Sequence, residues 1–311
     1  MIGVEVDLIG QAFWVGKSFI RVEAFGLMHV PIAVFLCDNG SLRPAATLGL
    51  RRVAAGLAKR LGHPVLPVSL LHSSGIDAVR LEGRPADLLE PAVEAALARG
   101  VTSIVVLPFF FGPSAALTEY IPERLGARLQ AAGQGEVRVA ASLVRLDRPE
   151  DDRVGRVLAE RVRELRRARG WSPGPVVLVD HGSPQPAVGA VRDLVAGQVA
   201  RLLGEPVWPS SMESREGDQY AFNRPLLAER LREPPCDAGR VVVLQQFLGP
   251  GRHAGEGGDL DVICREAERE RSGLEVAMTE PVGEDSRITE ILADRYREAL
   301  ESPPLAQRPP L

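Results

Sequence analysis

Three residues in the second half of the chain have the types and spacing of an open metal site. His181, Glu213 and His253 each follow a short apolar run, and the steps from 181 to 213 and from 213 to 253 are 32 and 40 residues. Each step is the length of one strand with its helix. Because parallel strands end at one edge of their sheet, we expect the three side chains to be neighbours. Imidazole and carboxylate ligands with a vacant coordination position suit Fe²⁺, Co²⁺, Ni²⁺ or Zn²⁺.

Each residue alone also has a simpler interpretation, since a histidine at a strand end is commonly a turn residue and a glutamate is commonly a surface acid. The first half of the chain argues against that interpretation. Its segment 38–41 (Asp-Asn-Gly-Ser) repeats segment 180–183 (Asp-His-Gly-Ser) at an offset of 142 residues. The candidate ligands are not repeated: Asn39 stands for His181, His72 lies near the place of Glu213, and Ala116 stands for His253. Structural caps would be needed equally in both halves, so we interpret the three residues as metal ligands.

Alternating apolar runs and amphipathic stretches predict an α/β protein with parallel sheets. The repeat predicts two tandem flavodoxin-like domains, each a four-stranded parallel sheet with helices on both faces, strands two and three flanking strand one. The predicted strands are 32–37, 65–70, 103–109, 137–143, 176–179, 206–212, 240–247 and 275–278. The predicted helices are 45–61, 85–99, 115–132, 153–169, 187–203, 219–232, 256–271 and 285–300.

These elements divide the chain into five parts. Residues 1–30 form a leader to which we assign no role, and residues 31–146 form a first, degenerate domain without metal ligands. Residues 147–175 are a linker helix and turn, whose charges we interpret as a solvated face. Residues 176–301 form the second domain with the metal site, and 302–311 a proline-rich tail that we expect to be frayed.

Composition restricts the function further. The chain has 311 residues, 45% hydrophobic and 25% charged, and a net charge of −4, which argues against a broad nucleic-acid surface. Cys37, Cys236 and Cys264 show no metal or redox spacing, so we expect a reducing compartment, the cytoplasm. The first 30 residues have the charge pattern of neither a signal peptide nor a membrane helix. We therefore expect no membrane partner.

Three segments of the second half resemble the class II tetrapyrrole chelatases of the CbiX/SirB type. They are Leu178–Ser183, Met212–Glu213 and Val242–His253. The first half is similar to the same family through Ser103–Gly112 and Ile121–Leu125. The resemblance implies insertion of a divalent metal, usually cobalt or iron, into sirohydrochlorin on the way to cobalamin or sirohaem. It also implies that His181 and His253 bind the incoming metal and that Glu213 is a further ligand or a proton acceptor.

The chemistry fits these residue types, because insertion needs a weakly held metal and the removal of two pyrrole protons. The metal is then a substrate, Co²⁺ or Fe²⁺ and possibly Ni²⁺, and no organic cofactor is needed. A polycarboxylate macrocycle predicts a cleft between the halves with apolar walls, such as Phe109–Phe111 and Phe247, and cations at the rim. We assign Arg252 and Arg215 to its carboxylates. Ser183 is grouped with them, although we interpret it first as the N-cap of the next helix.

Two departures from the family leave alternatives open. Many two-half bacterial members carry the ligands in the first half, and here Gly257 and Gly258 lengthen the loop after His253. The main alternative is a tetrapyrrole- or metal-binding protein without turnover. A hydrolase triad is disfavoured because Asp180, His181 and Ser183 share one turn. A histidine phosphatase is weakened by the extra alanine in Arg252–Glu256, and no phosphate or dinucleotide loop is present. A monomer or a homodimer is compatible with the sequence.

Overall fold

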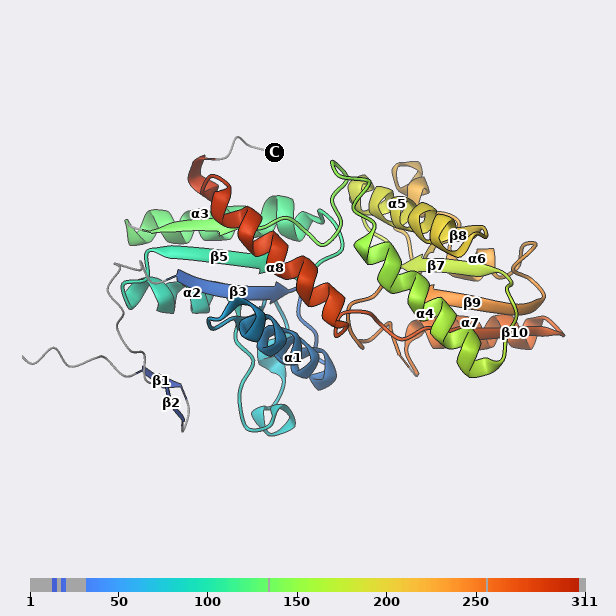
Figure 1. Cartoon of the computed structure of the whole chain (residues 1–311), viewed down its shortest axis with the longest axis horizontal. Coiled ribbons are helices and arrows are strands. Elements are labelled where there is room, and N and C mark those ends of the chain that lie inside the picture. Colours follow the sequence, from blue (N-terminus) through green and yellow to red (C-terminus); the bar gives the residue numbers. More distant parts are fainter. Residues whose placement is uncertain (1–12, 16–17, 21–31, 134, 256, 308–311) are drawn as a thin grey trace, which may run out of the picture.

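Two four-stranded parallel sheets lie side by side in the computed structural model, which describes residues 13–15, 18–20, 32–133, 135–255 and 257–307 (Figure 1). The first sheet has the order β4-β3-β5-β6 and the second the order β10-β9-β7-β8. Their bounds are β3 Ile32–Asp38, β4 Leu66–Ser69, β5 Ser103–Pro108, β6 Glu136–Val139, β7 Val176–Asp180, β8 Val207–Ser211, β9 Gly239–Gln245 and β10 Leu274–Met278. The predicted tandem α/β fold and its strand order are confirmed. The predicted fourth strand, 137–143, is too long, since β6 ends at Val139.

The central strands are buried and mostly apolar because helices cover both faces of each sheet. Every residue of β5 and of β7 is buried. The helices are α1 Pro44–Leu61, α2 Leu89–Ala98, α3 Ile121–Ala132, α4 Arg153–Arg169, α5 Pro186–Leu203, α6 Leu227–Arg230, α7 Asp259–Glu270 and α8 Ser286–Glu301. This double cover explains why the strands show continuous apolar runs rather than alternation.

The helix predicted at 219–232 is wrong. A 3₁₀ helix at Asp218–Asn223 and the short α6 replace it. Pro225 lies between them and Arg224 is extended, with φ −90° and ψ 154°. Proline has no N–H to donate and excludes the helical conformation at the residue before it, so one continuous helix cannot form there.

Helix α4 is part of the second domain's packing rather than a linker with a solvated surface. It lies against α5 and β9, and its residues Val154, Val157, Leu158 and Val162 are buried. The apolar side chains recur at three- and four-residue spacing, which gives the helix one face for the core. The interpretation of the helix as a solvated, charged surface holds only for the opposite, arginine-rich face.

Helix α8 follows the last strand of the second sheet but crosses to the first domain. It packs on α1, β5 and β6, and Figure 1 shows it in red lying across the first sheet. The sequence assigned this helix to the second domain because it comes last in the chain. The apolar face of α8, which includes Ile288, Leu292 and Tyr296, is instead buried in the layer shared with α1.

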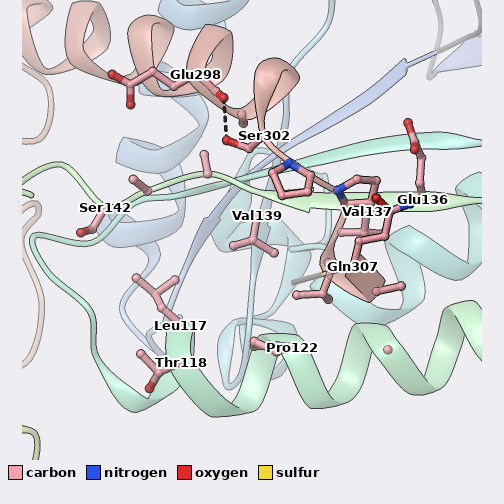
Figure 2. Close-up of a pocket in the computed structure, with 18 of the residues that line it drawn as sticks. Leu117, Thr118, Pro122, Glu136, Val137, Val139, Ser142, Glu298, Ser302 and Gln307 are labelled. Carbon is pink, nitrogen blue, oxygen red and sulfur yellow. Dashed lines mark hydrogen bonds between the residues drawn. The ribbon is translucent and has the colours of Figure 1, made fainter. Parts of the chain in front are cut away.

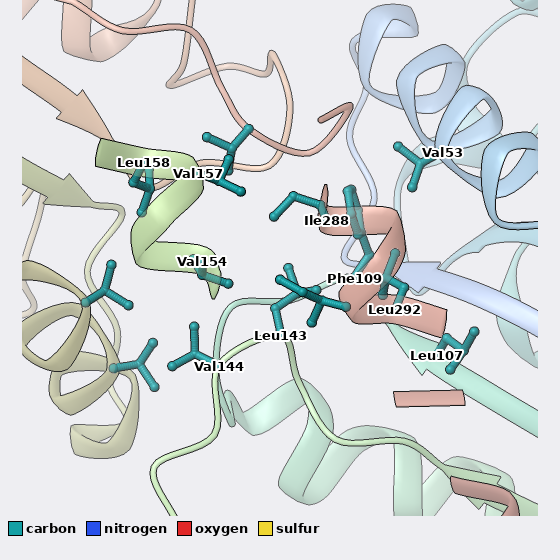
Figure 3. Close-up of a cluster of buried hydrophobic side chains, with 14 of the residues drawn as sticks. Val53, Leu107, Phe109, Leu143, Val144, Val154, Val157, Leu158, Ile288 and Leu292 are labelled. Carbon is teal, nitrogen blue, oxygen red and sulfur yellow. The ribbon is translucent and has the colours of Figure 1, made fainter. Parts of the chain in front are cut away.

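One hydrophobic core runs through both halves. Phe109 and Leu143 from the first half belong to the same buried cluster as Val154 and Leu158 of α4 and Ile288 of α8, and Figure 3 labels these side chains. The two sheets are therefore held in a fixed relation by shared packing. Any cleft between them is built by the fold, not by the approach of two independent domains.

A buried arginine completes this junction. The side chain of Arg295 on α8 is 1% exposed, and it donates to the carbonyl oxygens of Ser142 and Leu143. It also pairs with Asp151 and Glu298. The segment that passes from the first sheet to α4 is thus fixed to α8.

The tail packs on the first sheet as far as the structure describes it. Residues Leu305–Gln307 form a 3₁₀ helix beside β6, and Leu305 contacts the apolar cluster there. The expectation of fraying is wrong for residues 302–307; residues 308–311 lie outside the described part. Between β6, α3 and this tail is a cavity of about 1410 Å³ (Figure 2). None of the candidate metal ligands or substrate-binding residues predicted from the sequence lines this cavity.

Most of the leader also lies outside the described residues. Two short strands within it, β1 Phe13–Val15 and β2 Ser18–Ile20, pair antiparallel. None of the helices in the described part of the chain is long and apolar enough to cross a membrane.

Candidate metal centre

Parallel strands β7 and β8 bring His181 and Glu213 together. The last residues of these strands, Asp180 and Ser211, are register partners. Two residues further on, the N–H of Glu213 donates to the carbonyl oxygen of His181 over 3.2 Å. The His181 Nε2 atom and the Glu213 Oε1 atom are 3.5 Å apart.

A glycine permits this close approach. Gly182 has φ +91°, and a Cβ atom at this position would lie 2.0 Å from the carbonyl oxygen of Glu213. Only glycine fits both the conformation and the space. The His-Gly pair in the sequence is therefore a geometric requirement for placing Glu213 beside His181.

The third residue, His253, reaches the same place from the loop after β9. Its ring centroid lies 4.6 Å from that of His181, and the two rings meet edge to face at 73°. The N–H of Leu260 in α7 donates to the carbonyl oxygen of His253 over 3.1 Å, which fixes the loop to the helix. The structure thus places the three side chains predicted from spacing next to one another, and their role as ligands stays a prediction.

Hydrogen bonds at Nδ1 determine which nitrogen each histidine presents. His181 Nδ1 lies 3.0 Å from the carbonyl oxygen of Gly182, and His253 Nδ1 lies 2.6 Å from Oδ2 of Asp259. A carbonyl and a carboxylate only accept, so in the neutral form of each imidazole the proton lies on Nδ1 and the lone pair on Nε2. Orientation of an imidazole by a carboxylate in this way is typical of metal-binding histidines. Asp259 was not selected from the sequence, where an acid in the first turn of a helix indicates only a favourable dipole interaction.

The site is open rather than closed. The side chains of His181, Glu213 and His253 are 46%, 61% and 27% exposed. Within the described residues, no three His, Cys, Asp or Glu side chains are arranged so that they could hold a metal ion as they stand. An ion bound at the two Nε2 atoms would have protein ligands on one side and exchangeable positions on the other.

Asp180 supports the turn from below. It is buried, and its Oδ1 atom accepts from the Ser211 hydroxyl over 2.6 Å and from the Gly182 N–H over 3.1 Å. Burial raises the pKa of Asp180, while Ser211 and the guanidinium of Arg192, 4.0 Å away, oppose that rise. Its Oδ2 atom has no hydrogen-bond partner among the described residues. The carboxyl of Asp180 thus stabilises the turn that carries His181.

A cleft of about 820 Å³ between the two domains contains both histidines. Phe110 and Phe111 line it from the first domain and Phe247 from the second, so the predicted apolar walls are present. Phe109 belongs mainly to the shared core. This cleft is smaller than the cavity beside β6, but it is lined by both candidate histidines, while Glu213 lies beside His181 outside its lining.

The predicted substrate contacts are only partly brought to the cleft. Arg252 lines it and is 80% exposed, and its one ion pair with a described residue is a long one, 3.8 Å to Asp259. Arg215 does not line it; its guanidinium lies over the ring of Tyr220 at 5.9 Å.

Ser183 is neither the N-cap of α5 nor a residue that lines the cleft. Pro186 occupies the first turn of α5, and Gln185 is its N-cap. The Ser183 hydroxyl instead accepts from the Gln185 N–H over 3.1 Å. Its backbone N–H donates to the Asn223 side chain, and its carbonyl oxygen accepts from the same amide.

The first domain reproduces the backbone of the site without its ligands. Leu71 N–H donates to the carbonyl oxygen of Asn39 over 3.2 Å, and a Cβ atom on Gly40 would lie 1.8 Å from the carbonyl oxygen of Leu71. Leu71 therefore occupies the place of Glu213, and His72, selected from the sequence as the nearest equivalent, is one residue further on. Ala116, the counterpart of His253, lies in the π turn Ala116–Tyr120 before α3.

Comparisons with known proteins agree with this architecture. The family model described as CbiX matches residues 175–299, which include all three candidate ligands. The match covers the second domain, and this part of the chain is similar to the CbiX family. A comparison with curated protein sequences gives no match.

Similar solved structures cover both domains. SirB from Bacillus subtilis with Fe³⁺ is 16% identical with a TM-score of 0.61, over 86% of this chain and 95% of that one. The sirohydrochlorin chelatase SirB from Bacillus subtilis subspecies spizizenii in complex with cobalt is 17% identical with a TM-score of 0.62, over 88% and 96%. CbiX, described as the terminal enzyme for siroheme biosynthesis in denitrifying bacteria, is 14% identical with a TM-score of 0.56, over 86% and 99%. At these identities the likeness shows the fold, which is that of the two-domain chelatases.

Proposed function

We propose that this protein is a chelatase that inserts Co²⁺ or Fe²⁺ into sirohydrochlorin, with His181, Glu213 and His253 as the metal-binding and catalytic residues. The observation that carries the proposal is the contact between the rings of His181 and His253, 4.6 Å between centroids, in the lining of the interdomain cleft, with a Glu213 carboxylate oxygen 3.5 Å from His181 Nε2. The family of the second domain and the titles of the related structures, which name iron and cobalt, support it.

The site suits a metal that must be both captured and released. Two neutral imidazoles and one carboxylate bind a divalent transition metal less tightly than a closed thiolate site, and they leave coordination positions for the incoming ring nitrogens. The metal is the substrate, so weak binding is an advantage. Glu213, which is exposed and 3.5 Å from His181, can also accept a proton that the macrocycle releases.

The cleft suits a flat macrocycle with acidic side chains. Its phenylalanine walls can pack on the ring faces, while Arg252 at the rim is available to a carboxylate. Arg215 and Ser183 lie away from the cleft lining, so we no longer assign them to the substrate. A cytoplasmic location and a monomeric or homodimeric state are compatible with the proposal.

The test is metal insertion followed by absorption spectroscopy. Purified protein with Co²⁺ or Fe²⁺ is expected to change the spectrum of sirohydrochlorin faster than the metal alone. A binding protein without turnover would give a different result: a histidine-dependent metal titration with no acceleration of insertion. That outcome would overturn the chelatase proposal in favour of the binding protein.

A further inference from the structure

His72, in the domain without metal ligands, has an unusual backbone. Its φ is 65° and its ψ is −41°, and the N–H of Ser73 donates to the carbonyl oxygen of Leu71 over 2.7 Å. This is a γ-turn of the rare, strained form centred on a histidine. The other described non-glycine residue with positive φ, Glu82, has φ 61° and ψ 34° and so lies in the ordinary left-handed region. Strain of this kind persists only where the surrounding structure enforces it.

A hydrogen-bond network enforces the turn. The Ser73 hydroxyl donates to the Ser69 hydroxyl over 2.9 Å, and Ser69 donates to Oδ1 of Asp38 over 2.6 Å. The hydroxyl oxygen of Ser73 also accepts from the backbone N–H of Ser41 over 3.1 Å. Ser69 and Ser73 are buried. The turn is therefore tied to the ends of both β3 and β4, and the position of His72 is fixed by its neighbours.

The imidazole itself has no structural partner. The side chain of His72 is exposed and makes no hydrogen bond or ion pair with the residues that the structure describes. It lines the same cleft as His181 and His253, but from the first domain. The other charged or titratable groups that line this cleft are Asp38, Arg43, Asp180, Arg252 and Glu284. A turn that was only structural would be less strained with glycine or asparagine at this position.

We propose that His72 is the proton acceptor on the side of the macrocycle that faces away from the metal-binding histidines. The inference rests on the proposed function and assigns a catalytic task to the first domain. When the dication enters, the macrocycle must lose two N–H protons. The lone pairs of His181 and His253 Nε2 are then occupied by the metal, so those atoms cannot accept them.

An imidazole that the first domain contributes to the cleft can act as the base for one of these protons. One pyrrolic N–H bond breaks, its proton passes to a ring nitrogen of His72, and the electron pair stays on the pyrrole nitrogen that binds the metal. The imidazolium then returns the proton to water, since the side chain is exposed. The second proton leaves by Glu213 or directly to solvent, so charge and atoms balance with no further reactant.

The test compares His72→Gln, His72→Ala and His72→Gly with wild type in the full chain. Insertion of Co²⁺ into sirohydrochlorin is measured as kcat and KM, and Co²⁺ affinity is measured by calorimetry without the macrocycle. We expect kcat to fall about 100-fold in all three variants with little change in Co²⁺ affinity, and added imidazole to restore part of the rate of His72→Ala. His72→Gly should also raise Tm by about 1–3 °C, because glycine relieves the strained turn.

A matched control is His63→Gln, since His63 lies outside the cleft and contacts Tyr296 over 2.9 Å; its kcat should stay at the wild-type value. Wild-type kcat in folded His72→Gln would overturn the inference and leave the chelatase proposal intact. A loss of Co²⁺ affinity in the His72 variants would also overturn it, because His72 would then be a ligand. Absence of insertion by the wild-type protein would overturn both proposals together.

Discussion

The ring of His253 meets the ring of His181 edge to face, with 4.6 Å between their centroids. The two residues belong to loops that follow different strands. Their contact arises because β7 lies between β8 and β9, so the loops that follow these three strands converge.

Asp259 is expected to determine the nitrogen that His253 offers to the metal. In Asp259→Asn the side-chain amide can donate to Nδ1, which would move the imidazole proton to Nε2 and remove the free lone pair. We expect Co²⁺ affinity to fall about 10–100-fold by calorimetry. Asp261→Asn is the matched control, since Asp261 lies in the same helical turn but bonds to Arg265 and Gly257. Equal affinities for the two variants would contradict the orienting role of Asp259.

Gly182 is expected to be irreplaceable for both stability and metal binding. In Gly182→Ala the added Cβ would meet the carbonyl oxygen of Glu213 at 2.0 Å, so the loops after β7 and β8 must separate. We expect a loss of more than about 2 kcal/mol in the free energy of unfolding, measured with urea, and a parallel loss of Co²⁺ binding. Gly204→Ala has a similar positive φ, +74°, but no atom within 4 Å of its Cβ, and should lose only about 1–2 kcal/mol. If both variants lose the same amount, close approach is not the reason for the glycine.

Asp38 gives a prediction for the pH dependence of stability. Burial raises the pKa of Asp38 from 3.8 to about 6, against the opposing hydrogen bonds from Ser69 and Gly40. The folded protein therefore binds this proton more tightly than the unfolded chain does. The resulting penalty is absent below about pH 4 and fully present above about pH 6. Asp38→Asn should therefore raise the free energy of unfolding by about 1–3 kcal/mol at pH 8 and by little at pH 4.

A carboxyl whose pKa is shifted in the opposite direction provides the control for that experiment. Asp285, the N-cap of α8, has its pKa lowered by the hydrogen bond from Arg287. Its contribution to stability is present above its unfolded pKa and is lost as the pH falls through its folded pKa, so Asp285→Asn should destabilise the protein at pH 8. A gain of stability for Asp38→Asn that is the same at pH 4 and pH 8 would refute the titration argument.

Arg295 is expected to hold the junction between the domains. In Arg295→Met the carbonyl oxygens of Ser142 and Leu143 lose their donor, and Asp151 loses a buried partner. We expect a loss of about 3–5 kcal/mol in the free energy of unfolding, measured with urea. Arg297→Met, on the exposed side of the same helix, should change it by less than about 1 kcal/mol. Similar losses for both would show that the buried network is not what joins α8 to the first domain.

Much of the fold could be predicted from the sequence, because buried parallel strands produce continuous apolar runs and the repeat doubles the signal. The place of α8 could not. The amphipathic pattern of a helix predicts an apolar face. It does not predict which of two similar sheets that face packs against. Likewise, α4 carries apolar residues at three- and four-residue spacing among its many arginines. This spacing indicates that the helix is packed.

The site, too, could be predicted from the sequence only in part. The order of parallel strands was enough to bring His181, Glu213 and His253 together, since it depends only on chain topology. The partners that set each imidazole's tautomer depend on loop geometry and were missed, as Asp259 shows. Arg215 and Ser183 were selected for nearness in sequence to the ligands, but neighbouring loop residues point in different directions.

The most direct test of the central claim compares equivalent positions in the two halves, His181→Ala and Asn39→Ala. The measurement is the initial rate of Co²⁺ insertion into sirohydrochlorin under one set of conditions. We expect His181→Ala to fall to the uncatalysed rate and Asn39→Ala to stay within about two-fold of wild type. Insertion by His181→Ala at the wild-type rate, or an equal loss in Asn39→Ala, would contradict a metal centre built by the second domain.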